Sequence, residues 1–296
     1  MSVGSILRAG CFLILICVGA AVLTGAAWGD ALTDGRFRAE VAALIRGIRP
    51  GVRVLLEADP AQLSIGTKTI DLTNLYQRVD GLSAAERRRE VEEFLSVAFA
   101  KAAPGPETGD FAAIRSRLRP QLVPDEILQQ YTMLAHRRFS ETLHVVYVLD
   151  EPNRYQYVTR AMLAGWQVDP ALVEATAVAN LAATSREAPF ELVLGDGAPL
   201  FAMANAGDDF AIARLLVPSY LDEIRRALKA DSITLAGPTR NLLLAWPSGS
   251  PARRDLAAEA TRYLRTGPYG RSDELFRFDG RQVRPLNTME RADHGR

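Results

Sequence analysis

Four polar residues have types and positions that could support chemistry in one cleft: Asp150, Arg160, Asp208 and Arg240. If they converge, we expect a concave pocket with perturbed pKa values, as an enzyme needs for proton transfer. If they do not, a groove or an apolar patch without a proton-transfer pair is expected, as in a binding protein. No catalytic residue is assigned from the sequence alone.

Asp150 belongs to the stretch YVLDEPNRYQYVT, residues 147–159. Asp and Asn hydrogen-bond their own backbone and Pro presets φ, so Asp150, Pro152 and Asn153 are typical of a turn. The apolar runs on either side predict a β-hairpin. Asp150 and Glu151 are consecutive strand residues whose side chains point to opposite faces, so an acid–base pair requires the turn to bend them together.

Asp208 and Asp209 precede a segment with helical spacing. Acids at this place satisfy free backbone N–H groups and complement the helix dipole. A calcium loop would need several more oxygen ligands at alternating spacing. Helix capping is therefore the preferred interpretation of this pair.

Other chemistries have little support. The histidines His136, His144 and His294 form no HExxH motif, and His144 is interpreted as a hydrogen-bonded histidine within a strand. PSGSP (residues 247–251) fits a helix start better than a nucleophile elbow, and neither phosphate-loop motif is present. We expect no metal site and no cofactor.

The charges balance, with 35 basic and 35 acidic residues. No basic stripe with interleaved aromatic residues is present, so no nucleic-acid partner is expected, and other partners are unknown. The charge runs RRRE (87–90) and ARRD (252–255) are interpreted as solvated helix faces.

Residues 1–29 fit a cleavable secretory signal peptide, with Arg8 before an uncharged apolar run and Ala27 and Gly29 before Asp30. The alternative is an uncleaved inner-membrane anchor through residues 11–28, which would be the chain's membrane contact. Both cysteines lie in this segment, so the mature chain would contain no thiol. A periplasmic or secreted location is expected.

The remaining sequence predicts an α+β fold with largely antiparallel or mixed sheets and interspersed helices. We expect a small α-β-β-α domain over 30–103, a Pro/Gly linker over 102–110, a second α+β domain over 111–286 and a polar tail over 287–296, whose end RADHGR (291–296) is expected to be disordered. Within the second domain the pattern predicts extended chain over 114–124, a helix from 125 to about 136, strands joined at Gly237-Pro238 and a helix over 251–265.

Residues 111–286 resemble an uncharacterised bacterial family, the domain of unknown function 1444 (uncharacterised protein family 0354). Four segments carry the resemblance: IRSRLRPQLVP, HVVYVLDEPNRYQYVTRAMLAGWQVDPALVEATAVANL, GDDFAIARLLVPSYLDEI and ITLAGPTRNLLLAWP. The family has no assigned activity to carry over. The resemblance implies an acidic residue and a serine where this chain has Ala211 and Ala213, and Arg-Asp where it has Arg240-Asn241.

Together these observations favour a non-catalytic binding or accessory protein of the bacterial cell envelope. The motivation is the lack of a thiol, a histidine cluster or a phosphate loop in the mature sequence, together with the alanines at positions 211 and 213. The alternative is a hydrolase or transferase that acts on an envelope substrate through the Asp/Arg cleft. Convergence of the four residues named first distinguishes the two.

Overall fold

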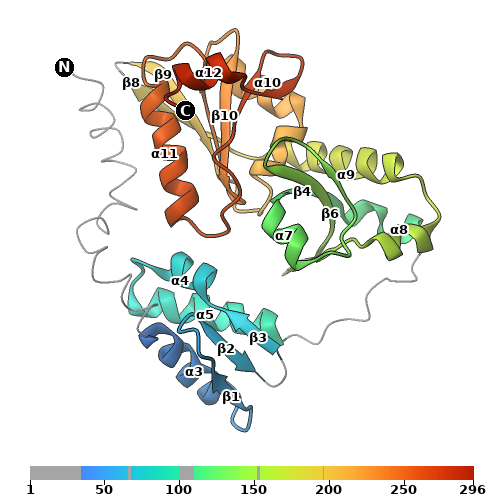
Figure 1. The fold of residues 1–296 in the computed structure, drawn as a ribbon, viewed down its shortest axis with the longest axis vertical. Helices are drawn as coiled ribbons and strands as arrows, with labels where there is room; N and C mark the ends of the chain where they lie inside the picture. The colour runs from blue at the N-terminus through green and yellow to red at the C-terminus, as the bar shows by residue number, and fades with distance from the viewer. Residues whose placement is uncertain (1–34, 66–67, 100–109, 152–153, 196) are drawn as a thin grey trace. The chain divides into compact units, whose positions relative to one another are not determined.

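The computed structural model describes residues 35–65, 68–99, 110–151, 154–195 and 197–296 (Figure 1). They form two compact units, 35–99 and 110–296, which are described separately. The expected signal peptide lies outside the described residues, as do residues 100–109 of the expected linker. Within the described part of the chain, every helix is too short or too polar to cross a membrane.

The first unit is a three-stranded antiparallel sheet with helices. The element order is α3 (Arg36–Ile48), β1 (Val54–Leu56), β2 (Gln62–Ile65), β3 (Lys68–Asp71), α4 (Thr73–Val79) and α5 (Ala84–Phe99), with β2 central in the sheet. Its core includes Val41, Leu63 and Val91, all fully buried. Ser83 and Glu86 form a capping box at the start of α5, since each side chain bonds the other's backbone N–H.

The second unit begins with a four-stranded antiparallel sheet built around one long strand. The elements are α6 (Phe111–Ile114), the 3₁₀ turn η2 (Arg115–Arg117), β4 (Leu118–Pro124), α7 (Asp125–Gln130), β5 (His136–Arg138), β6 (Leu143–Glu151) and β7 (Arg154–Tyr157). The long strand is β6. It pairs with β4 along one edge and with both β5 and β7 along its other edge. The β6–β7 pairing confirms the hairpin predicted around Asp150; residues 152–153 of its turn are not among those described.

Two helices then lead into a six-stranded antiparallel sheet. They are α8 (Arg160–Trp166) and α9 (Pro170–Ser185), and the sheet has the order β13-β12-β10-β11-β9-β8. Its strands and connecting elements are β8 (Glu191–Gly195), β9 (Ala198–Ala204), η3 (Ile212–Leu216), α10 (Pro218–Ala227), β10 (Ile233–Thr239), β11 (Leu242–Pro247), α11 (Arg253–Thr266), β12 (Leu275–Phe278), β13 (Val283–Pro285) and α12 (Thr288–Asp293).

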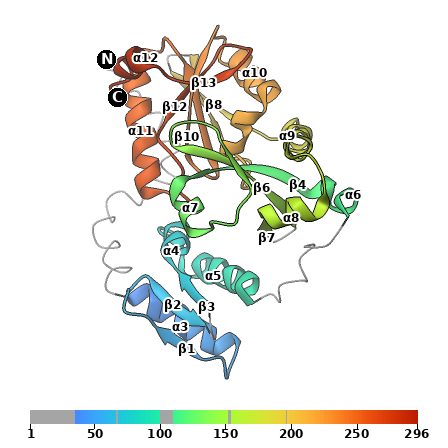
Figure 2. The ribbon, with the colours of Figure 1, turned by 45° about the vertical axis from the view of Figure 1, so that its right-hand side comes forward.

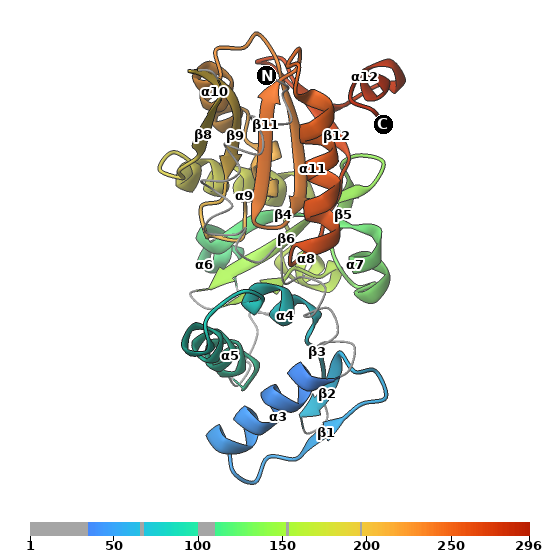
Figure 3. The same ribbon diagram turned by 90° about the vertical axis from the view of Figure 1, so that its left-hand side faces the viewer.

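One hydrophobic core joins the two sheets of this unit. It combines side chains of the four-stranded sheet, such as Leu118 and Val145, with Leu235 and Phe276 of the six-stranded sheet. Figures 2 and 3 show α11 along one face of the larger sheet and α10 on the opposite face. α9 packs on β4 and on η3, so this helix connects the smaller sheet to the segment after β9.

Three expected boundaries are wrong. Residues 111–117 are helical turns before the strand begins at Leu118, because Asp110 caps α6 by accepting from the Ala112 N–H at 3.0 Å. The helix from Asp125 stops at Gln130, and His136 lies in β5. The strand β10 continues through Gly237 and Pro238 to Thr239, with a register irregularity where a turn was expected.

The expected disorder of the C-terminal tail is also wrong. Residues 288–293 form α12, with a capping box between Asn287 and Glu290. Arg284 and Arg277 bond the Glu290 carboxylate and, with Arg284 contributing most, hold its pKa at about 2. His294 is 5% exposed and its ring centroid lies 6.1 Å from that of Trp246, so the tail is attached to the sheet.

Gly237 is required by the close approach of η3 to β10. A Cβ atom at this residue would lie 2.3 Å from Cγ1 of the fully buried Ile212. We expect Gly237→Ala to lower the free energy of unfolding by about 1–3 kcal/mol because the core is overpacked. Urea unfolding measures the effect, and Gly249→Ala is the control, since a Cβ atom at that glycine would have no neighbour within 4 Å. Equal stability of the two variants would contradict the argument.

Candidate functional site

The structure brings three of the four sequence-predicted residues into one region and places Arg160 elsewhere. Asp150 interacts electrostatically with Asp208 and Asp209, and Arg240 forms an ion pair with Asp209 at 2.8 Å. Arg160 begins α8, and its guanidinium donates hydrogen bonds to the carbonyls of Thr132 (2.6 Å) and Leu134 (3.3 Å). Arg160 therefore holds the segment before β5 and is not part of the acidic region.

The first part of the site is an ion pair between the buried Arg214 and Asp208, whose side chain is 35% exposed. Arg214 lies in η3, its side chain is fully buried, and both terminal nitrogens bond the two carboxylate oxygens, with Nη1–Oδ1 at 3.0 Å. Its Nε donates to the Ser185 hydroxyl at 3.1 Å, and its guanidinium lies 5.3 Å from the Tyr220 ring centroid. The Asp208 carboxylate thus balances the arginine charge, and the Ser185 hydroxyl accepts the remaining Nε–H.

The second part is Asp209 and its two partners. Asp209 has φ 65°, in the left-handed region that Asp tolerates better than most residues. Its carbonyl accepts from Gln121 Nε2 at 2.8 Å, while its carboxylate pairs with Arg240. The Arg240 guanidinium lies 3.8 Å from the Tyr269 ring centroid and also bonds Asn241 Oδ1 at 3.1 Å. Both aspartates therefore fix the loop between β9 and η3.

Asp150 differs from these two aspartates. Its side chain forms no hydrogen bond or ion pair with any residue that the structure describes. Partial burial raises its pKa, Arg119 on the neighbouring strand opposes the shift, and Asp208 and Asp209 add to it. The cluster thus contains one carboxyl group with a raised pKa, beside two carboxylates held by arginines.

The helix-capping interpretation of Asp208 and Asp209 is only partly right. Asp208 Oδ1 does accept from a backbone N–H, that of Phe210, at 3.1 Å. The helical turn η3, however, begins at Ile212 with Ala211 at its N-cap, so neither aspartate is the cap. Ser250 follows the same pattern: its Oγ accepts from Ala252 N, but α11 begins at Arg253.

The pairing of β5 with β6 brings two of the histidines together. The rings of His136 and His144 lie 5.5 Å apart, and His144 Nε2 is 2.6 Å from Asp125 Oδ1. This contact confirms His144 as a hydrogen-bonded histidine within a strand. Burial, followed by the neighbouring His144 and Arg160, lowers the pKa of His136. No group of three or more potential metal ligands occurs among the described residues.

Sequence reasoning missed Arg119, Gln121 and Arg214, which complete the cluster. Arg214 interrupts the apolar run AIARLL, and Gln121 lies between Pro120 and Leu122 in a strand. The side chains of Gln121 and Arg214 are fully buried. A polar residue at a position whose neighbours are apolar is a signal that a buried partner must exist, although the sequence does not identify that partner.

Comparison of the chain with protein-family models, with curated proteins and with solved structures finds no match. The site is therefore interpreted from its own geometry.

Loss of the Asp208 charge should destabilise the protein strongly. Asp208→Asn leaves the buried Arg214 guanidinium without its counter-charge, and we expect unfolding to become easier by about 2–4 kcal/mol. Adding Arg214→Met should restore part of this loss, since the unpaired charge is then absent. Urea unfolding measures both. The control is Asp231→Asn, at an exposed aspartate outside the cluster; a similar effect of this control would contradict the ion-pair argument.

The raised pKa of Asp150 predicts a pH-dependent difference in stability between the wild type and the Asp150→Asn variant. A pKa raised in the folded state favours folding below the unfolded value and destabilises the fold as pH rises through the folded value. Asp150→Asn carries no charge, so at pH 7 it should be more stable than the wild type. The difference should vanish well below pH 3.8, the ordinary value for Asp. Thermal unfolding between pH 3 and 8 measures this difference, and a variant less stable at pH 7 would refute the prediction.

Proposed function

We propose that this protein is an exported, non-catalytic binding or accessory protein of the bacterial cell envelope. The observation that carries the non-catalytic part is the use of the candidate residues as structural contacts. Asp208 is held by a buried arginine, Arg240 pairs with Asp209, and Arg160 bonds two backbone carbonyls. Each of these side chains is therefore already used to hold part of the fold in place.

Export is supported by the first 29 residues. An uncharged apolar run follows Arg8 and is followed by small residues before Asp30. The uncleaved alternative would leave the protein attached to the inner membrane through residues 11–28. In either case, the remainder of the chain would face the space outside the cytoplasm.

The resemblance of residues 111–286 to the domain of unknown function 1444 belongs to this proposal. If the chain is a divergent member, its alanines at 211 and 213 stand where polar family residues would be. Both alanines are buried beside the ion pair of Arg214. This chain would then have kept the fold and replaced those polar groups with core residues.

One observation favours a second candidate function, a hydrolase or transferase. Asp150 has a pKa raised above its ordinary value, chiefly by burial, and lies near the cationic side chain of Arg119. A general acid requires such a raised pKa, but it also requires a partner group in the same cleft. Asp208 and Asp209 are engaged by arginines, and this is why we rank catalysis second.

A direct comparison of Asp150→Asn with the wild type tests the two functions. The protein is incubated with chromogenic ester, phosphate and glycoside substrates. We expect no turnover that depends on Asp150, because no proton-transfer pair among the described residues includes it. A turnover that is present in the wild type and lost in the folded Asp150→Asn variant would favour the enzyme.

The N-terminus predicts a defined mature protein. After expression in a Gram-negative host, N-terminal sequencing of the protein from the periplasmic fraction should begin at Asp30. Replacing Ala27 with Arg should block cleavage, because signal peptidase reads small residues at this spacing. Chain beginning at Met1 in the membrane fraction would support the anchor, and cytoplasmic protein beginning at Met1 would contradict export.

A further inference from the structure

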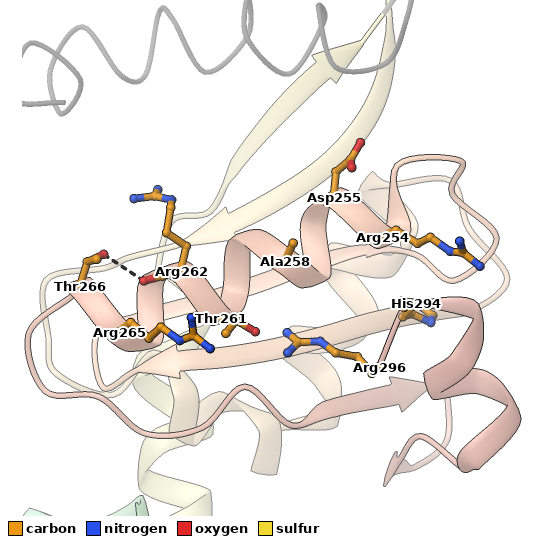
Figure 4. A pocket seen from close by; sticks show the side chains of 10 residues that line it. Arg254, Asp255, Ala258, Thr261, Arg262, Arg265, Thr266, His294 and Arg296 are labelled. Atoms are coloured by element: carbon orange, nitrogen blue, oxygen red, sulfur yellow. Dashed lines mark hydrogen bonds between the residues drawn. The ribbon is translucent and has the colours of Figure 1, made fainter. Parts of the chain in front are cut away.

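A concave surface runs along the outer side of α11, beside the last residues of the chain (Figure 4). Its lining consists of Arg254, Asp255, Ala258, Thr261, Arg262, Arg265, Thr266, His294, Gly295 and Arg296. We call it the α11 groove. It contains four arginines and one aspartate, and the side chain of Ala258 is the main apolar element of the helix there. The ARRD run, which the sequence suggested to be a plain solvated face, supplies one end of this groove.

The arginines of the α11 groove differ in what they bind. Arg262 is paired with Glu259, and Arg296 is paired with Asp273 at 2.8 Å. Arg254 has a weak contact from Nε to the Asp293 carbonyl at 3.3 Å, and Arg265 has no polar contact with any described residue. Both are exposed. The groove thus offers one guanidinium with open donors at each end.

Arg254 and Arg265 lie near the two ends of α11. Arg254 and Arg265 are 11 residues apart on one helix, which corresponds to roughly 16 Å along its axis. The small neutral side chains of Ala258 and Thr261 lie between them in the lining, together with Asp255 and with Arg262, which is paired with Glu259. A ligand that engages both ends must therefore be elongated, and it must be anionic at both ends.

We propose that the α11 groove binds a linear chain of phosphate groups, with Arg254 and Arg265 holding its two ends. Guanidinium groups bind phosphate oxygens in a bidentate way. A peptide ligand would need apolar or aromatic anchors, which Ala258 alone does not provide. A single-stranded nucleic acid would need exposed aromatic rings for its bases, and the lining contains none besides the buried ring of His294. The inference rests on the proposed role in binding, but not on export.

Linear inorganic polyphosphates of defined length test the proposal as rulers. Binding to the purified protein is measured by isothermal titration calorimetry at low salt, from pyrophosphate up to chains longer than the groove. We expect affinity to rise sharply once a chain reaches both arginines, because the second contact becomes intramolecular. Arg254→Gln and Arg265→Gln should each weaken binding of the long chain about tenfold or more. Each variant should still bind pyrophosphate at the arginine that it retains.

The matched control is Arg281→Gln, an exposed arginine in the β12–β13 turn whose side chain makes no hydrogen bond or ion pair with described residues. Its affinity for the long chain should equal that of the wild type. Circular dichroism checks that all three variants are folded, as expected for side chains with little or no contact. An oligoglutamate of equal charge should bind much more weakly than polyphosphate.

Three results would overturn the proposal. They are the absence of binding by the folded protein, binding that both arginine substitutions leave unchanged, and equal affinity for oligoglutamate, which would indicate an acidic peptide as the occupant. None of these results bears on the chromogenic-substrate test. The failure of polyphosphate binding in the α11 groove can therefore be distinguished from the failure of the proposed non-catalytic function.

Discussion

The buried guanidinium of Arg214 is the constraint on which the centre of the second unit depends. An arginine without solvent contact must be paired and fully hydrogen-bonded, because an isolated charge in the core costs several kcal/mol. Asp208 provides the counter-charge and Ser185, at the end of α9, provides a further acceptor. The loop after β9 and the end of α9 are therefore both fixed in relation to η3.

This fixed loop explains much of the surrounding geometry. Asp209 is placed where its carbonyl meets Gln121 of the four-stranded sheet and its carboxylate meets Arg240 of the β10–β11 turn. One short loop thus touches both sheets. Directly after it, η3 packs so closely on β10 that the strand has room only for glycine at position 237. The left-handed backbone of Asp209 is compensated by these contacts.

The sequence predicted the fold class well because most strands occur in hairpins with local turn signals. The β6–β7, β8–β9 and β12–β13 pairings all join neighbours in the chain. The errors at Gly237-Pro238 and in the C-terminal tail came from tertiary contacts. Gly237-Pro238 has the composition of a turn, yet β10 continues through it because β11 and η3 pack on either side. The tail at 287–296 is polar, yet it is ordered by Glu290 and the buried His294.

The candidate site was predictable from the sequence only in part. Asp150, Asp208 and Arg240 come from three distant segments, and their residue types were enough to select them as candidates. Their partners were not predictable, since Arg214 and Gln121 are paired through contacts that depend on the complete fold. Arg160 was selected wrongly as a member of the cluster because a charged residue at a helix start can equally hold a neighbouring backbone segment.

Overall charge balance conceals a local asymmetry that follows from these pairings. The chain has equal numbers of acidic and basic residues, but aspartates such as Asp208 and Asp209 are engaged by arginines at the centre of the second unit. An arginine elsewhere then lacks a carboxylate partner among the described residues, as Arg265 does on α11. Local excess of guanidinium groups therefore does not require a basic protein. It requires only that acidic side chains form their ion pairs elsewhere in the fold, as Asp208 and Asp209 do.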